Sequence, residues 1–127
     1  MPNYWFDHVH LISPDPIKTA EFYEKTFGAE RGAISELSDG RTSVVLNLSG
    51  VAIRVMSPRT QPLVPSTSQT GLEHFGIRTD DLEAAVAELK TKGVQVVQDV
   101  TVVRPGLKIS FFLAPENVLV ELLETNG

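Results

Sequence analysis

The chain has no cysteine among its 127 residues, which excludes disulfide bonds, thiolate metal ligands and thiol nucleophiles. It is also poor in positive charge, because 11 Lys and Arg against 16 Asp and Glu leave a formal net charge of −5. This balance argues against a protein that neutralises nucleic-acid phosphates or an anionic membrane surface. No apolar run approaches the roughly 20 residues of a membrane-spanning helix, and the start MPNYWFDH lacks the features of a secretion signal. We therefore expect a cytoplasmic protein with neither nucleic acid nor membrane as its partner.

The sequence contains an internal repeat within a length that suits one domain. FDHVHLISPDP near the start and LEHFGIRTDDL from residue 72 share one order of features: an acid, a histidine, alternating apolar residues, a polar stop and an acid suited to a helix start. His8 and His74 occupy matching places in the two copies. The chain is therefore expected to fold as two similar halves.

A helix is predicted after each copy of the repeat. A glycine suited to the left-handed position after a helix follows each segment, Gly28 in the first half and Gly93 in the second. Asp15 is the predicted cap of the first helix, and Thr79 that of the second. The apolar residues that show helical spacing are Ile17, Ala20, Tyr23 and Phe27, then Leu82, Ala85, Val86 and Leu89.

Beyond each glycine the apolar period changes to two, which predicts antiparallel strands separated by turns. The fold class is then α+β, with two βαβββ modules, 1–57 and 71–127, joined by a linker over 58–70 in a single domain, 1–127. We expect the modules to form a curved mixed sheet with a shared cleft, either within one chain or across a homodimer. The predicted strands are 29–37, 41–49, 51–57, 94–102, 107–114 and 118–124.

Glu121 stands in the apolar segment VLVELLE, where both faces of the predicted strand are apolar. A carboxylate there is costly unless it is paired, protonated or bound to a cation. The alternative is that Glu121 lies at a sheet edge or a wet surface.

Two histidines at equivalent positions of a repeat suggest more than either one alone. A single histidine in an apolar strand is most often a core or surface residue. His8 and His74 with Glu121 form a set of two imidazoles and one carboxylate, which holds Mn, Fe, Ni, Co or Zn and leaves positions open for water and substrate. His10 shares a strand face with His8, and we assign it to substrate contact or proton transfer, with a structural role as the equal alternative.

These residues resemble the vicinal oxygen chelate superfamily, which includes glyoxalase I, methylmalonyl-CoA epimerase, fosfomycin-resistance transferases, extradiol dioxygenases and bleomycin-binding proteins. The resemblance is carried by FDHVHLISPDPIKTAEFYEKTFGAE, LEHFGI and APENVLVELLE. It implies paired βαβββ modules, frequent homodimers, and a divalent ion that binds a small substrate through neighbouring oxygens. It also implies that His8, His74 and Glu121 are the metal ligands.

One position departs from the pattern of this superfamily. Aligning VAIRVMSP with VLVELLET puts Arg54 where glyoxalase I and the epimerase commonly have Glu or Gln. Arginine stays protonated and offers no lone pair, so it cannot be a ligand. Arg54 would instead hold an anionic group of the substrate. In a metal-free binding protein of the bleomycin-resistance kind, it would form an ion pair with Glu121.

The expected function is a glyoxalase-like lyase or isomerase that chelates a small oxygen-rich substrate on a divalent ion. His8, His74 and Glu121 would bind the ion, Arg54 and His10 the substrate, and His10 and Glu121 would be catalytic, with His10 as the proton carrier. The alternatives are an enzyme with three metal ligands, similar to extradiol dioxygenases or fosfomycin transferases, and a metal-free small-molecule binding protein.

Overall fold

The computed structural model describes residues 3, 6–60 and 72–126 of the chain. The chain divides into two compact units, Met1–Leu63 and Val64–Gly127. Of the predicted linker over 58–70, residues 61–70 lie outside the described part. Each unit follows the order strand, helix and three strands, as the repeat predicts.

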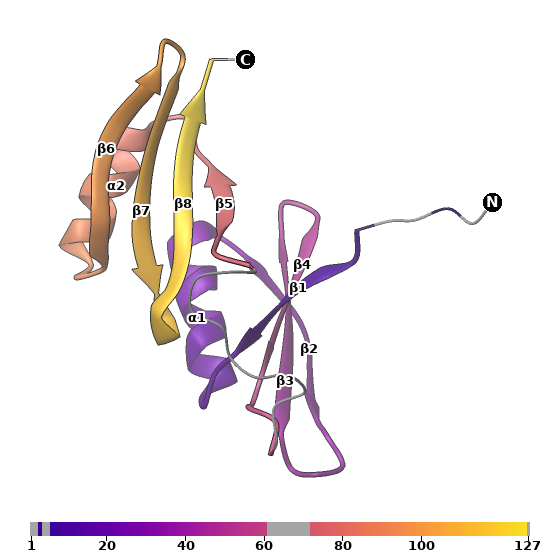
Figure 1. Ribbon diagram of the computed structural model, residues 1–127. Helices are drawn as coiled ribbons and strands as arrows, with labels where there is room; N and C mark the ends of the chain where they lie inside the picture. The colour runs from indigo at the N-terminus through magenta and orange to yellow at the C-terminus, as the bar shows by residue number, and fades with distance from the viewer. Residues whose placement is uncertain (1–2, 4–5, 61–71, 127) are drawn as a thin grey trace. The chain divides into compact units, whose positions relative to one another are not determined.

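The first unit is a four-stranded mixed sheet with one helix (Figure 1). The sheet order is β1-β4-β3-β2, in which β1 runs parallel to β4 and the other neighbouring strands are antiparallel. Its elements are β1 (His8–Ile12), α1 (Pro16–Phe27), β2 (Glu30–Glu36), β3 (Thr42–Leu48) and β4 (Val51–Met56).

The second unit repeats this topology with the order β5-β8-β7-β6, and the long strands β6, β7 and β8 stand side by side in Figure 1. Strand β5 runs parallel to β8, and the other pairs are antiparallel. The α+β prediction is thus confirmed. The elements are β5 (Phe75–Arg78), α2 (Leu82–Thr91), β6 (Gln95–Arg104), β7 (Leu107–Ala114), the short 3-10 helix η1 (Pro115–Asn117) and β8 (Val118–Thr125).

The helix boundaries follow from local chemistry. The carboxylate of Asp15 accepts a hydrogen bond from the backbone N–H of Lys18 at 3.1 Å, which confirms the predicted cap of α1. Gly28 and Gly93 follow the two helices with φ of 72° and 77°, a left-handed conformation that favours glycine. No helix in the described part of the chain is long and apolar enough to span a membrane.

The predicted cap of α2 was wrong. The cap is Asp81, whose carboxylate accepts from the backbone N–H of Ala84 at 3.1 Å. The hydroxyl of Thr79 instead accepts from the N–H of Asp81 at 3.3 Å, before the helix begins. A carboxylate is favoured at this place because it carries full negative charge at the positive end of the helix dipole.

One face of each sheet packs against the helix of its own unit and forms the core. Successive strand residues point to opposite faces, so the residues between the buried ones lie on the other face, which we call the open face of that unit. The candidate site residues of the strands β1, β4 and β8 lie on open faces. The buried residues of the cores include Ala20, Tyr23, Val44, Leu46, Ile53 and Val55 in the first unit, and Leu82, Val86, Leu89, Phe112, Val120 and Leu122 in the second.

Candidate metal centre

His74 and Glu121 lie together on the open face of the second unit. Gly76 pairs with Glu121 across the parallel strands β5 and β8, and His74 precedes Gly76 by two residues. The Nε2 atom of His74 is 3.6 Å from Oε1 of Glu121, with side chains 29% and 22% exposed. This separation is too long for a hydrogen bond, yet it leaves both atoms within reach of one bound ion.

The surroundings of the Glu121 carboxylate are apolar. Leu119 and Leu123 flank it on the same face of β8, and Phe111 is its partner on the antiparallel strand β7. Across β5, a Cβ atom built on Gly76 would lie 3.5 Å from Oε1 of Glu121, so glycine leaves space beside the carboxylate. The sequence predicted the apolar neighbours on β8, and the apolar surroundings as a whole make a compensating positive charge favourable.

The ring of Phe111 packs edge-on against the imidazole of His74. Their centroids are 5.1 Å apart and the ring planes meet at 87°. An aromatic contact of this kind restricts the orientation of the imidazole. No feature of the sequence singled out Phe111, although its place opposite Glu121 follows from pairing the predicted strands 107–114 and 118–124 across their turn.

Each histidine of the repeat contacts the acid that precedes it. The Nδ1 atom of His8 is 2.7 Å from Oδ2 of Asp7, and Nδ1 of His74 is 3.0 Å from Oε1 of Glu73. The hydrogen bond with His8 lowers the pKa of the Asp7 carboxyl. No role was predicted for either acid, although the acid before each histidine is part of the repeat.

The first unit places His10 beside Arg54, its register partner on β4, with both residues on the open face that also carries His8. Partial burial lowers the pKa of His10, and the nearby positive charges of His8, Arg59, Arg54 and Arg41 lower it further. This open face therefore carries a positive field suited to an anionic group.

His8 belongs to the first unit, whereas His74 and Glu121 belong to the second. The set of three metal ligands therefore stays a prediction, and so does the ion pair between Arg54 and Glu121.

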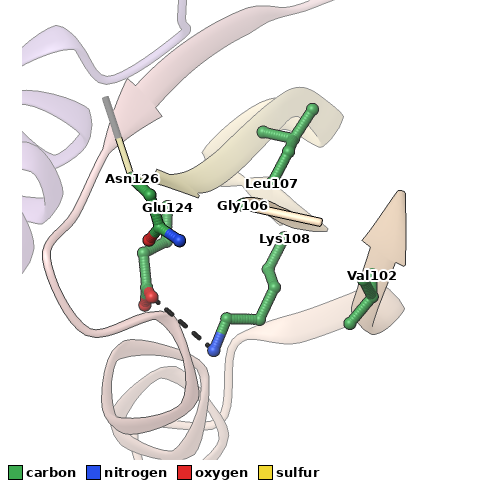
Figure 2. Close-up of a pocket in the computed structure, with 6 residues that line it drawn as sticks. All are labelled: Val102, Gly106, Leu107, Lys108, Glu124 and Asn126. Carbon is green, nitrogen blue, oxygen red and sulfur yellow. Dashed lines mark ion pairs between the residues drawn. The ribbon is translucent and has the colours of Figure 1, made fainter. Parts of the chain in front are cut away.

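A second group of charged residues lies at the start of α2. Two of them, Lys108 and Glu124, line a pocket of about 350 Å³ near the β6–β7 turn (Figure 2). Lys108 on β7 lies 2.9 Å from a carboxylate oxygen of Glu83 and 3.6 Å from one of Glu124. The hydrogen bond with Glu83 raises the pKa of Lys108. Glu124 also accepts from the backbone N–H of Leu82 at 2.8 Å. Asp81 completes a carboxylate cluster with Glu83 and Glu124, but these contacts identify the cluster as a structural support of α2.

Known proteins similar to this chain cover nearly its whole length. The family model described as Glyoxalase/Bleomycin resistance protein/Dioxygenase superfamily matches residues 5–122. Human mitochondrial methylmalonyl-CoA epimerase is 30% identical over 125 residues, a match that covers 91% of this chain and 71% of the human protein.

Solved structures show the same fold. A glyoxalase family protein from Enterococcus faecalis superimposes with a TM-score of 0.75 at 23% identity, covering 92% of this chain and 94% of that one. A mutant of the fosfomycin resistance protein FosX from Listeria monocytogenes, solved with Mn(II) and 1S,2S-dihydroxypropylphosphonic acid, gives a TM-score of 0.73 at 21% identity, with 100% of this chain and 94% of that chain covered. The chain belongs to the glyoxalase/bleomycin resistance protein/dioxygenase superfamily, as its histidine and glutamate motifs predicted.

Proposed function

We propose that this protein is a metal-dependent lyase or isomerase that chelates a small, oxygen-rich, anionic substrate on a divalent ion. His74 and Glu121 would hold the ion together with His8, taken from the same chain or from a second copy in a homodimer. The observation that carries the proposal is the approach of His74 Nε2 to Glu121 Oε1, at 3.6 Å, on a half-buried apolar face.

The donors of this pair suit a transition-metal ion. Imidazole nitrogen and carboxylate oxygen bind Mn, Fe, Co, Ni and Zn, so the donor set does not select one metal. His74 and Glu121 would hold such an ion through Nε2 and Oε1, which lie 3.6 Å apart. A bound ion would act as a Lewis acid that polarises a substrate oxygen.

Glu121 and His74 have different tasks at this centre. The Glu121 carboxylate supplies negative charge in apolar surroundings, where its attraction for a cation is stronger than in water. His74 supplies a neutral donor whose ring orientation is restricted by the edge contact with Phe111. Three protein ligands would leave coordination positions open for the substrate.

Arg54 and His10 are the proposed substrate contacts of the first unit. The guanidinium of Arg54 can bind a carboxylate or a phosphoryl group through two parallel hydrogen bonds. His10 is the register partner of Arg54, and its imidazole would take a proton from a substrate held by Arg54 and return it. Arg41 and Arg59 add to the positive field on His10.

The similar proteins support an isomerase before the other reaction classes. The mammalian relatives are named as methylmalonyl-CoA epimerases. FosX, which shares the fold, was solved with Mn(II) and an anionic diol. The arginine at position 54 favours a centre with three protein ligands, and a dioxygenase-like or transferase-like activity is therefore the second candidate.

Deuterium exchange tests the proposal. The protein is incubated with methylmalonyl-CoA in D2O, with MnCl2 or with a chelator. In the proposed reaction, the C–H bond beside the thioester carbonyl breaks, His10 accepts the proton, and a solvent-derived deuteron returns to the same carbon. We expect exchange with MnCl2, none with the chelator, and none in His10→Gln, which should still bind Mn²⁺. Metal-dependent binding without exchange would favour the second candidate, and binding of the thioester unaffected by the chelator would favour a metal-free binding protein.

A further inference from the structure

We propose that Asp7 and Glu73 are positioning residues that fix the tautomer of His8 and His74, so that both rings present the Nε2 lone pair to the metal ion. This inference rests on the proposed function, since it assigns a role to two acids at the same centre. Neither acid would touch the ion.

The hydrogen bonds indicate which ring nitrogen carries the proton. In both units the carboxylate contacts Nδ1, at 2.7 Å for His8 and 3.0 Å for His74. An ionised carboxylate only accepts hydrogen bonds, so Nδ1 must be the donor in each contact. A neutral imidazole has one N–H group, and Nε2 therefore keeps its lone pair.

The second contact of His74 agrees with this assignment. If Nε2 carried the proton of a neutral ring, it would donate to Glu121, and such a charge-assisted bond is about 2.7–2.9 Å long. The observed separation of Nε2 and Oε1 is 3.6 Å. Two acceptors that face each other at this distance form a favourable arrangement when a cation lies between them.

The same contact between an acid and the following histidine occurs in both units, which distinguishes it from a chance surface contact. Asp7 and Glu73 stand at equivalent places of the repeat and differ in side-chain length, yet both reach the same nitrogen of the following histidine. Their side chains are 80% and 76% exposed, so these bonds add little to folding stability. These hydrogen bonds can orient the two imidazole rings without contributing to folding stability.

The expected size of the effect follows from the exposure of the two acids. Loss of a hydrogen-bond partner behind a ligating histidine weakens metal binding by about 10- to 100-fold. Because water can replace an exposed carboxylate, we expect the lower end, about tenfold for Asp7→Asn and for Glu73→Gln. Glu36→Gln is the matched control, since it removes one exposed carboxylate at the end of β2 that contacts neither histidine.

The experiment reads tautomer and affinity separately. Long-range ¹H–¹⁵N NMR spectra of the metal-free protein at pH 8, above the ordinary histidine pKa of about 6.5, assign the protonated nitrogen of each ring. Electron paramagnetic resonance of free Mn²⁺ gives the affinity of the parent and of each variant. We expect Nδ1–H for His8 and His74 in the parent, a mixture of tautomers at the affected ring in Asp7→Asn and Glu73→Gln, and parent-like results for Glu36→Gln.

Two results would overturn the inference. Nε2–H tautomers at His8 and His74 in the parent would refute it whatever the metal affinity. Unchanged Mn²⁺ affinity in both Asp7→Asn and Glu73→Gln would show that the acids do not act through the rings. If the parent bound no Mn²⁺, the proposed function would fail and this role with it, and the tautomers would show whether the geometry or the metal was the error.

Discussion

Replacing Glu121 by glutamine separates a metal ligand from a structural ion pair. The substitution keeps the size of the side chain and removes its charge. Glu121 is 22% exposed and lies 3.6 Å from His74, beyond hydrogen-bond distance. If the carboxylate serves a metal ion, the metal-free variant should be as stable as the parent, because a half-buried charge is removed from apolar surroundings.

The free energy by which a bound metal ion stabilises the folded protein sets the expected rise in Tm. An ion at 100 times its dissociation constant stabilises the folded state by about 2.7 kcal/mol. For a chain of 127 residues, this corresponds to a rise in Tm of about 10 °C, at about 4 °C per kcal/mol. Differential scanning calorimetry with MnCl2 and with a chelator should show this rise in the parent and little or none in Glu121→Gln.

Glu124→Gln is the matched control from the same strand. Glu124 contacts Lys108 and the N–H of Leu82 at the start of α2, so its loss should lower the Tm of the metal-free protein and leave the metal-induced rise intact. The reasoning is refuted if Glu121→Gln keeps the full rise. It is also refuted if the metal-free variant loses about 3–5 kcal/mol, the loss expected when one partner of a buried ion pair is removed.

Three further predictions test the packing around the site and the cores. A Cβ atom at position 76 would lie 3.3 Å from Leu123 Cδ2 and 3.5 Å from Glu121 Oε1. Because such crowding costs about 1–3 kcal/mol, Gly76→Val should weaken Mn²⁺ binding by about tenfold or more. A parent-like Mn²⁺ affinity of this variant in a calorimetric titration would contradict the prediction. Phe112 is fully buried. Phe112→Ala should therefore lower the free energy of unfolding of the second unit, measured in urea, by about 3–5 kcal/mol. A loss below about 1 kcal/mol would show that Phe112 does not anchor this core. Burial raises the pKa of Tyr23 above its ordinary value of 10.0, so the phenol ionises at a lower pH in the unfolded chain than in the folded one. The free energy of unfolding should therefore fall above pH 10, by at most about 1.4 kcal/mol per pH unit. Spectrophotometric and urea titrations of Tyr23→Phe should show that this part of the alkaline loss of stability has disappeared, and an unchanged loss would contradict the assignment.

Most of the fold was predictable because both halves of the chain carry the same local sequence pattern. The helical spacing, the left-handed glycines and the change to a period of two place each element close to where the structure has it; the strand predicted over 29–37, for example, is β2 (Glu30–Glu36). The cap of α2 was missed because Thr79, Asp80 and Asp81 are all acceptable caps by residue type. The choice among them depends on where the chain enters the helix.

The site was predictable in residue type and less so in contacts. The apolar neighbours of Glu121 predicted a carboxylate that needs a positive partner, and the structure brings His74 beside it. Asp7, Glu73 and Phe111 were missed because alternation assigns a residue to a face without giving the rotamer that makes a contact. Whether one ion binds His8 together with His74 and Glu121 depends on the arrangement of the two units. The local sequence patterns of either half do not encode that arrangement.

The central claim is that His8, His74 and Glu121 hold one divalent ion. The most direct test is elemental analysis of the protein after loading with MnCl2 and removal of unbound metal, beside His8→Ala, His74→Ala and Glu121→Gln. We predict one Mn²⁺ per chain in the parent and far less than one in each variant. A parent without stoichiometric metal, or variants that keep the parent's full content, would contradict the claim.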